Sequence, residues 1–245
     1  FSCRCAPKEF SLRPHTAIPM LTFPAIDPIA LSIGPVAIHW YALAYLAGFL
    51  LGWRYCLSLA QKISNAPAAQ LFDDFLTWAI LGTIIGGRLG YVLFYNAEEY
   101  AAHPLEMFKI WNGGMSFHGG MMGVIGSALI FARVRKINFF AFTDILACVT
   151  PIGLGLGRLA NFINGELFGR TTDLPWGVVF PRGGDLPRHP SQLYEATLEG
   201  IVLFMILFAL SRRISITARK GYLSGVFLLG YGLLRFAVEF VREPD

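Results

Sequence analysis

The sequence carries little charge for its length. Asp, Glu, Lys and Arg make up 15% of the 245 residues, whereas a soluble globular chain usually has about a quarter of them. An ordinary soluble enzyme is therefore not expected. The formal net charge is only +4, and the basic residues form no stripe of the kind that nucleic-acid-binding proteins present. We predict no nucleic-acid partner.

The sequence also lacks several motifs of metal and nucleophile chemistry. The four cysteines form no CxxC pair and no metal-ligand spacing. It contains no GxSxG and no HExxH motif, which argues against an intramembrane protease. Apolar residues, in contrast, make up 55% of the chain, which excludes a disordered protein.

Six stretches are long and apolar enough to cross a membrane as helices, which requires about 20 residues each. They are residues 28–53, 75–97, 110–132, 145–165, 190–211 and 221–238. We therefore predict an all-α polytopic membrane protein, a bundle of six transmembrane helices.

Charges in the connecting loops predict how this bundle is oriented. The loops that follow the first, third and fifth stretches are short and basic, which is typical of cytoplasmic loops. Residues 95–115 and 166–190 then face outward. The segment 166–190 is rich in Gly, Pro and Asp, so we expect it to form a small cap outside the membrane.

The first 19 residues do not fit this plan. They have no apolar core and no small-residue cleavage site, so we expect an N-terminal extension rather than a signal peptide, with Met20 as the natural start. Residues 20–245 are then expected to form a single transmembrane domain.

Ionisable residues inside the apolar stretches lie at a common depth. A helix rises about 1.5 Å per residue, which places Arg88, Arg158 and Arg235 in the outer third of the membrane. Tyr41 and His118 open stretches that descend from the same side. Because charge is costly inside a membrane and usually marks a functional site, we predict one polar cavity open toward the outer leaflet.

Two carboxylates accompany these arginines. Glu166 follows Arg158, and Glu239 lies one helical turn past Arg235. Two carboxylates leave three guanidiniums with a surplus positive charge. An anionic phospholipid matches that surplus, because the planar guanidinium binds phosphate oxygens in bidentate fashion.

Simpler interpretations of the same residues remain open. Arg235 and Glu239 are spaced i, i+4, which also gives a plain intrahelical ion pair. Arg158 could reach the interface along its alkyl chain. Glu195 and Glu199 share a helix face and could be solvated. His118 alone is more often a packed or interfacial histidine.

Four segments of the chain resemble the bacterial prolipoprotein diacylglyceryl transferase family. Residues 157–170 (GRLANFINGELFGR) resemble the family signature, and residues 115–120 (MSFHGG) resemble its histidine segment. Residues 189–195 (HPSQLYE) and 230–239 are similar to blocks that belong to the fifth and sixth spans. The resemblance runs from about Phe23 to Asp245. The family normally has a seventh span, which we expect this chain to lack.

The resemblance implies a multi-pass enzyme of the bacterial inner membrane whose active site faces the periplasm. Such an enzyme transfers the diacylglyceryl group of phosphatidylglycerol to the lipobox cysteine of a prolipoprotein signal peptide. The products are a thioether and glycerol 1-phosphate. The resemblance implies no metal or cofactor. The positions that match residues needed by the family are Tyr41, His118, Arg158, Asn161, Glu166, Gly169, Arg235 and Glu239.

These residues suggest a division of roles. Arg158 and Arg235 are the expected phosphate clamp, and Glu166 and Glu239 are expected to orient the two guanidiniums. His118 is the candidate general base, with headgroup binding as its alternative. Further residues expected to bind substrate by hydrogen bonding or by shaping the site are Tyr41, Arg88, Asn161, Asn164, Gly169, Tyr194 and Glu195.

Two other classes of protein remain as alternatives. A transporter of an anionic lipid or another anion would also place arginines in a membrane cavity, usually between inverted repeats with broken helices. A non-catalytic assembly protein would use Glu195, Glu199 and the cap for docking.

Overall fold

The computed structural model describes residues 21–24, 26–33, 36–63 and 66–243. The expected N-terminal extension, residues 1–19, and Met20 lie outside this range. Within it, six helical runs are long and apolar enough to cross a membrane, which confirms the predicted all-α polytopic fold. They are α1 (Trp40–Lys62), α2 (Ala69–Phe94), α4 (Phe117–Val134), α5 (Phe139–Ile163), the continuous run Ser191–Ser211 and α9 (Tyr222–Glu239).

The run Ser191–Ser211 is a composite helix. It consists of α6 (Ser191–Glu195), a π-helical segment, η3 (Ala196–Val202), and α7 (Leu203–Ser211). Short helices fill the connections between the long ones. They are α3 (Ala97–Ala102), the two 3₁₀ turns η1 (Pro104–Phe108) and η2 (Ile110–Asn112), and α8 (Ile214–Thr217).

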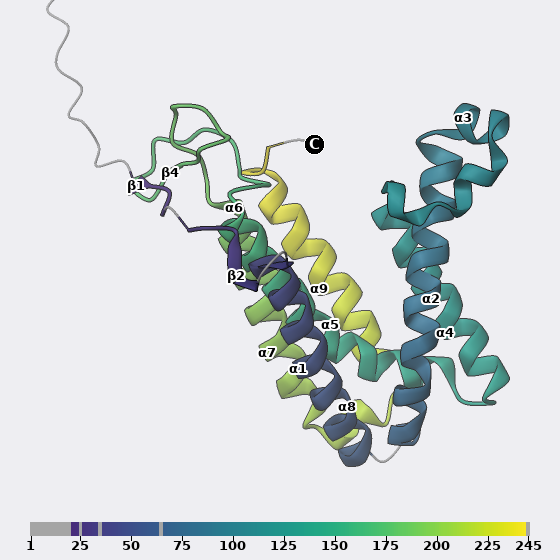
Figure 1. The fold of residues 1–245 in the computed structure, drawn as a ribbon. Helices are drawn as coiled ribbons and strands as arrows, with labels where there is room; N and C mark the ends of the chain where they lie inside the picture. The colour runs from purple at the N-terminus through teal and green to yellow at the C-terminus, as the bar shows by residue number, and fades with distance from the viewer. Residues whose placement is uncertain (1–20, 25, 34–35, 64–65, 244–245) are drawn as a thin grey trace, which may run out of the picture.

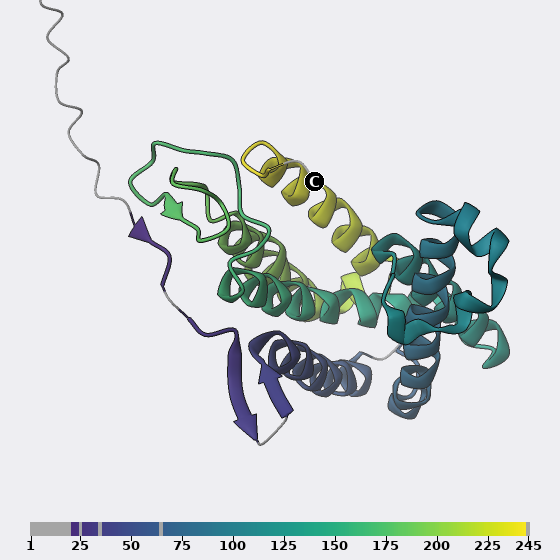
Figure 2. The same ribbon diagram turned by 45° about the horizontal axis from the view of Figure 1, so that its top comes forward.

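The helices form two groups, as Figures 1 and 2 show. One group is a bundle of α1, α5, the composite helix and α9. The other is a hairpin of α2 and α4, which diverges from the bundle toward the end that carries α3. Glycines let α2 and α4 approach closely, since a Cβ on Gly123 would lie 2.0 Å from the carbonyl oxygen of Gly82. Small residues allow this kind of close helix packing in membranes.

A cluster of aromatic rings joins the hairpin to the bundle. Phe72 and Phe75 of α2 meet Phe142 of α5 with ring centroids 4.8 and 5.0 Å apart, and Phe131 of α4 lies 5.6 Å from the same ring. Phe131 and Phe142 are fully buried. Nearby, the Asp144 carboxylate accepts hydrogen bonds from the first N–H groups of α9. Both contacts fix the end of the molecule opposite the cap.

The start of the first predicted span is wrong. Two strands, β2 (Ile29–Ile33) and β3 (Val36–His39), form an antiparallel pair, and the helix begins only at Trp40. The segment 28–39 is uncharged, so hydropathy alone does not distinguish it from the helix that follows.

The segment between α5 and α6 contains no long helix. Its one described strand, β4 (Val178–Val179), pairs in parallel with β1 (Leu21–Thr22). The two views place this segment beside the end of α9 and the start of α6 (Figures 1 and 2). The cap is therefore next to the ends of the two helices that carry Glu195 and Arg235.

Candidate active site

Glu195 is the centre of a buried ion cluster. Its side chain is 1% exposed, and its Oε2 atom contacts Nε of Arg158. Its Oε1 atom lies 3.3 Å from Nη1 of Arg235 and 4.0 Å from Nε of Arg242. One carboxylate at the end of α6 therefore brings together guanidiniums from α5, from α9 and from the segment after α9.

This finding corrects the predicted pairing of charges. We expected Glu166 and Glu239 to orient the arginines, and we left Glu195 with a solvated alternative. Glu239 does pair with Arg235, at 3.0 Å, although its side chain is 51% exposed. Glu166 forms no ion pair with any described arginine. The carboxylate that holds Arg158 and Arg235 at one place is Glu195.

A second acidic group lies beside the cluster. Glu199 is fully buried, which excludes the solvated alternative. Neither of its carboxylate oxygens has a hydrogen-bond partner among the described residues, and its charged neighbours are Glu195, Arg158 and Arg235. Glu199 lies in the π-helical segment, a rare conformation that is frequently found at functional sites.

Glu166 belongs instead to an amide cluster at the end of α5. Its Oε1 atom accepts hydrogen bonds from Asn161 Nδ2 at 2.9 Å and from Asn164 Nδ2 at 3.2 Å. Asn164 is also the C-cap of α5, and its backbone N–H donates the last helical hydrogen bond to the carbonyl of Ala160. The two predicted asparagines therefore hold the predicted glutamate, and the three form one unit.

The backbone after α5 turns sharply around this unit. Gly165 has a φ of +63° and Leu167 a φ of +56°. Glycine adopts this left-handed conformation freely, whereas leucine is strained in it. The turn is tied to the start of α6, since Gln192 Nε2 donates to the carbonyl of Glu166 at 2.6 Å and Ser191 Oγ donates to that of Leu167 at 3.0 Å.

Glycine is required at position 169 because a side chain would not fit there, and not because of the backbone conformation. A Cβ at this position would lie 2.4 Å from the carbonyl oxygen of Val241 and 2.7 Å from Cβ of His189. Its backbone forms a bridge with Arg242. Gly169 therefore lets the segment before α6 and the segment after α9 meet. We predicted substrate binding for this residue, and the structure gives it a packing role.

Tyr194 forms part of a polar chain on the cap side of the cluster. Its hydroxyl accepts a hydrogen bond from Trp176 Nε1 at 2.7 Å and lies 3.3 Å from Nδ1 of His189. Partial burial lowers the pKa of His189 below its usual value. These contacts fix the aromatic ring one residue before Glu195.

Tyr41 is the second residue of α1. Its hydroxyl lies 3.0 Å from that of Tyr45, and its charged neighbours are Glu166 and Arg158. The phenol is therefore near enough to Glu166 and Arg158 to be affected by both charges, and its side chain is partly exposed. This position suits the predicted hydrogen bond to a headgroup.

The structure differs from the expectation for Arg88. All five of its guanidinium N–H donors are used by carbonyl groups of the loop between α2 and α4, those of Glu106, Met107, Lys109, Gly113 and Gly114. The side chain is buried. No donor is left for a phosphate, and Arg88 instead holds the loop that leads to α4.

His118 lies in the first turn of α4 and is exposed. Its described side-chain contact is the ring of Phe117. It belongs to the hairpin of α2 and α4, whereas Arg158 and Arg235 belong to the bundle. The structure therefore brings the arginines together with Glu195, and no hydrogen bond or ion pair among the described residues joins them to His118.

A polar pocket of about 400 Å³ adjoins the amide cluster, lined in part by Asn164 and Glu166. The described residues contain no group of three or more His, Cys, Asp or Glu side chains that could hold a metal ion. The chemistry that the cluster offers is the binding of an anion by guanidiniums.

A family model described as prolipoprotein diacylglyceryl transferase matches residues 28–245. The chain belongs to this family. A protein of Azospirillum brasilense named phosphatidylglycerol–prolipoprotein diacylglyceryl transferase is 56% identical over 227 residues, which cover 92% of this chain and 85% of that protein. A protein of the same name from Paramagnetospirillum magneticum is 59% identical over 226 residues, covering 92% and 84% of the two chains.

Membership of the diacylglyceryl transferase family confirms the resemblance and the predicted enzyme class. The chain is a transferase with membrane-spanning helices, and the transporter alternative is not supported.

Some residues that build this transferase site were missed by the sequence analysis. Arg242 is buried beside Glu195, but it lies after the end of α9, so a helical spacing from Arg235 does not predict its position. Ser191 and Gln192 bind backbone carbonyls, and no pattern in the sequence indicates such contacts.

Proposed function

We propose that this chain transfers the diacylglyceryl group of phosphatidylglycerol to the lipobox cysteine of a prolipoprotein. The products are a thioether-linked lipoprotein precursor and glycerol 1-phosphate. The names of its relatives support this substrate pair. The observation that carries the proposal from the structure is the shared contact of Arg158 and Arg235 with the buried Glu195.

The reaction requires positive charge where the leaving group gathers negative charge. The cysteine thiolate attacks the terminal glyceryl carbon, a new S–C bond forms, and the C–O bond to phosphate breaks. The electron pair of that bond stays on the phosphate oxygen. Arg158 and Arg235 bind and stabilise this phosphate. Glu195 keeps the two guanidiniums from separating and limits their repulsion.

The thiol must lose its proton, because the thiolate is the nucleophile. His118 is the proposed general base, since it is exposed at the start of α4 and a neutral imidazole can accept a proton. Tyr41 and the unit of Asn161, Asn164 and Glu166 hydrogen-bond oxygens of the headgroup. Glu239 aligns Arg235 from the exposed side of the cluster. Tyr194 and Gly169 form part of the walls of the site.

The proposed location is the bacterial inner membrane. The short basic loops lie in the cytoplasm, so the cap and the arginine cluster face the periplasm, where the substrate cysteine is presented. Residues 20–245 act as one catalytic transmembrane domain, with residues 166–190 as its periplasmic cap.

A reconstituted assay tests this function. The purified protein is mixed in vesicles with phosphatidylglycerol labelled in its headgroup glycerol and a lipobox peptide. We expect release of labelled glycerol 1-phosphate together with a thioether on the peptide. A peptide with serine in place of the cysteine is the control and gives no release. Labelled lipid that crosses the vesicle without thioether formation contradicts the proposal and indicates a transporter.

A further inference from the structure

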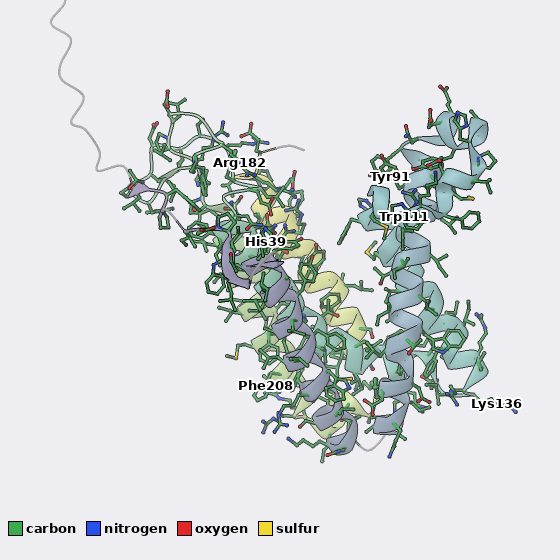
Figure 3. The ribbon with its side chains drawn as sticks, viewed as in Figure 1. His39, Tyr91, Trp111, Lys136, Arg182 and Phe208 are labelled. Carbon is green, nitrogen blue, oxygen red and sulfur yellow. The ribbon has the colours of Figure 1, made fainter. Side chains whose placement is uncertain are left out.

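The loop between the composite helix and α9 concentrates positive charge. Residues 212–220 (RRISITARK), called the basic loop below, contain four cationic side chains and no acidic one. All four are exposed, namely Arg212, Arg213, Arg219 and Lys220. Figure 3 shows Phe208, in the last turn before this loop, at the opposite end of the molecule from Arg182 in the cap. The basic loop is therefore remote from the proposed active site.

The cations of the basic loop have no acidic partner within the described part of the chain, where no ion pair involves any of the four. At the other end of the molecule, in contrast, Lys109 pairs with Glu106 and Arg188 pairs with Glu243. The acidic side chains at the end that carries the basic loop already have donors, namely Asp73, Asp74 and Asp144. The positive charge of the basic loop is therefore left for an external anion.

The basic loop also has the features of a segment that contacts a membrane surface. The guanidinium of Arg212 lies over the ring of Phe208, 4.4 Å from its centroid, and Phe208 belongs to a membrane-spanning run. This contact places the charge at the end of the apolar helix. The next helix, α8, leaves 82% of Ile214 exposed beside Arg213. An exposed apolar side chain among cations suits a bilayer with anionic headgroups better than a soluble acidic protein.

We propose that the basic loop binds headgroups of anionic phospholipids in the leaflet opposite the proposed active site. The guanidiniums of Arg213 and Arg219 bind phosphate oxygens in bidentate fashion, while Ile214 enters the apolar part of the same leaflet. Four cations next to a membrane-spanning helix are enough to recognise an anionic lipid surface. This site is separate from the transfer reaction, and it holds whichever lipid the enzyme uses as substrate.

A headgroup bound at the basic loop also holds the start of α9. Lys220 directly precedes Gly221, whose N–H donates to the Asp144 carboxylate at 2.7 Å, and the N–H of Ser224 donates to the same carboxylate at 2.7 Å. Lys220 and Asp144 line one small cavity. The basic loop is thus continuous with the joint between α5 and α9, and we expect lipid binding to make local opening of this joint rarer.

Amide hydrogen exchange over residues 212–224 tests this binding in the full chain. The protein is placed in nanodiscs of phosphatidylcholine alone, or of phosphatidylcholine mixed with phosphatidylserine, an anionic lipid that is not the proposed substrate. We expect exchange in this segment to be at least about fivefold slower in the anionic nanodiscs, which is the effect of a single cation at an anionic surface. Because the readout is confined to this segment, it does not register lipid bound at the arginine cluster.

A double variant, Arg213→Gln with Arg219→Gln, should lose most of this protection. The matched control is Arg54→Gln with Arg133→Gln, which removes the same charge from exposed arginines of α1 and α4. The control should keep the protection that the unaltered chain shows in anionic nanodiscs. None of the four arginines belongs to the proposed catalytic machinery, so both double variants should retain transfer activity.

Equal exchange of the unaltered chain in the two kinds of nanodisc overturns the proposal. Equal loss of protection in the two double variants also overturns it, because the effect is then one of net charge and not of the basic loop. Inorganic phosphate, added to phosphatidylcholine nanodiscs, is the probe for a soluble anion. Protection by phosphate as strong as that by phosphatidylserine indicates a soluble ligand and contradicts a lipid site.

Discussion

The Oε1 atom of Glu195 lies 3.3 Å from Nη1 of Arg235, and the other oxygen of the same carboxylate contacts Arg158. Because Arg158 belongs to α5 and Arg235 to α9, this one carboxylate couples two membrane helices at the proposed phosphate site. The position of both guanidiniums therefore depends on Glu195.

Replacing Glu195 by glutamine should remove most of the activity. The amide keeps the size of the side chain but leaves the guanidiniums of Arg158 and Arg235 without their shared negative charge. Removing one partner of a buried ion pair typically costs about 3–5 kcal/mol. We expect kcat to fall by about 100-fold or more, which corresponds to about 2.7 kcal/mol, together with a lower Tm in detergent.

Two variants provide the comparison for Glu195→Gln. Glu239→Gln should have a smaller effect on kcat, because Glu239 is half exposed and pairs only with Arg235. Glu199→Gln should also be milder, since Glu199 forms no hydrogen bond with a described residue. If Glu195→Gln is the least affected of the three, Glu195 is not the centre of the cluster.

Replacing Gly169 by alanine should destabilise the cap side of the site. The added Cβ would meet the backbone of Val241 and the side chain of His189, so the segments that carry Arg242 and lead to Glu195 must separate. We expect a Tm lower by several degrees and at least tenfold less activity, the loss that a displacement of the arginines predicts. Gly232→Ala in α9 is the control, because nothing lies within 4 Å of a Cβ there. Equal effects of both substitutions contradict this account.

Replacing Arg88 by lysine should loosen a loop rather than weaken lipid binding. An ammonium group has three donors and cannot replace the five that Arg88 gives to carbonyls. We expect faster amide hydrogen exchange over residues 104–114, with KM for phosphatidylglycerol unchanged within about twofold. A large rise in KM with unchanged exchange indicates instead that Arg88 binds the lipid.

The sequence predicts the structure correctly where a long apolar run or a regular helical spacing is present. The helices from 69 to 239 follow from long apolar runs, and the pairing of Arg235 with Glu239 follows from their i, i+4 spacing. The start of α1 was missed because the strands before it are as uncharged as the first 14 residues of the helix, 40–53.

Contacts between distant segments could not be predicted in the same way. The sequence predicts a similar membrane depth for Arg88, Arg158 and Arg235. Membrane depth, however, does not tell which helices are neighbours. Arg88 belongs to the hairpin and is bound by its own loop, whereas Arg158 and Arg235 meet at Glu195. The burial of Glu199 depends on the π-helical segment, which no sequence pattern indicated.

The stability of the cap should depend on pH through His189. Partial burial lowers the pKa of this imidazole below 6.5, so the native state binds fewer protons than the unfolded state between the two pKa values. Stability is therefore full above the unfolded pKa and decreases as pH falls from about 6.5 toward the lower native pKa. We expect Tm to decline over this range, and His189→Gln should decline less steeply. Identical pH profiles for the two proteins contradict the assignment to His189.

The most direct measurement of the central claim is the rate of glycerol 1-phosphate release by Arg158→Lys and Arg235→Lys variants that retain the Tm of the unaltered chain. Lysine keeps the charge but cannot bind phosphate and Glu195 with the same planar fork. We predict that each substitution lowers the rate by about 100-fold or more, as the loss of an interaction made to the leaving phosphate requires. Rates within about twofold of the unaltered chain, in either variant, would contradict the claim that the two guanidiniums hold that phosphate.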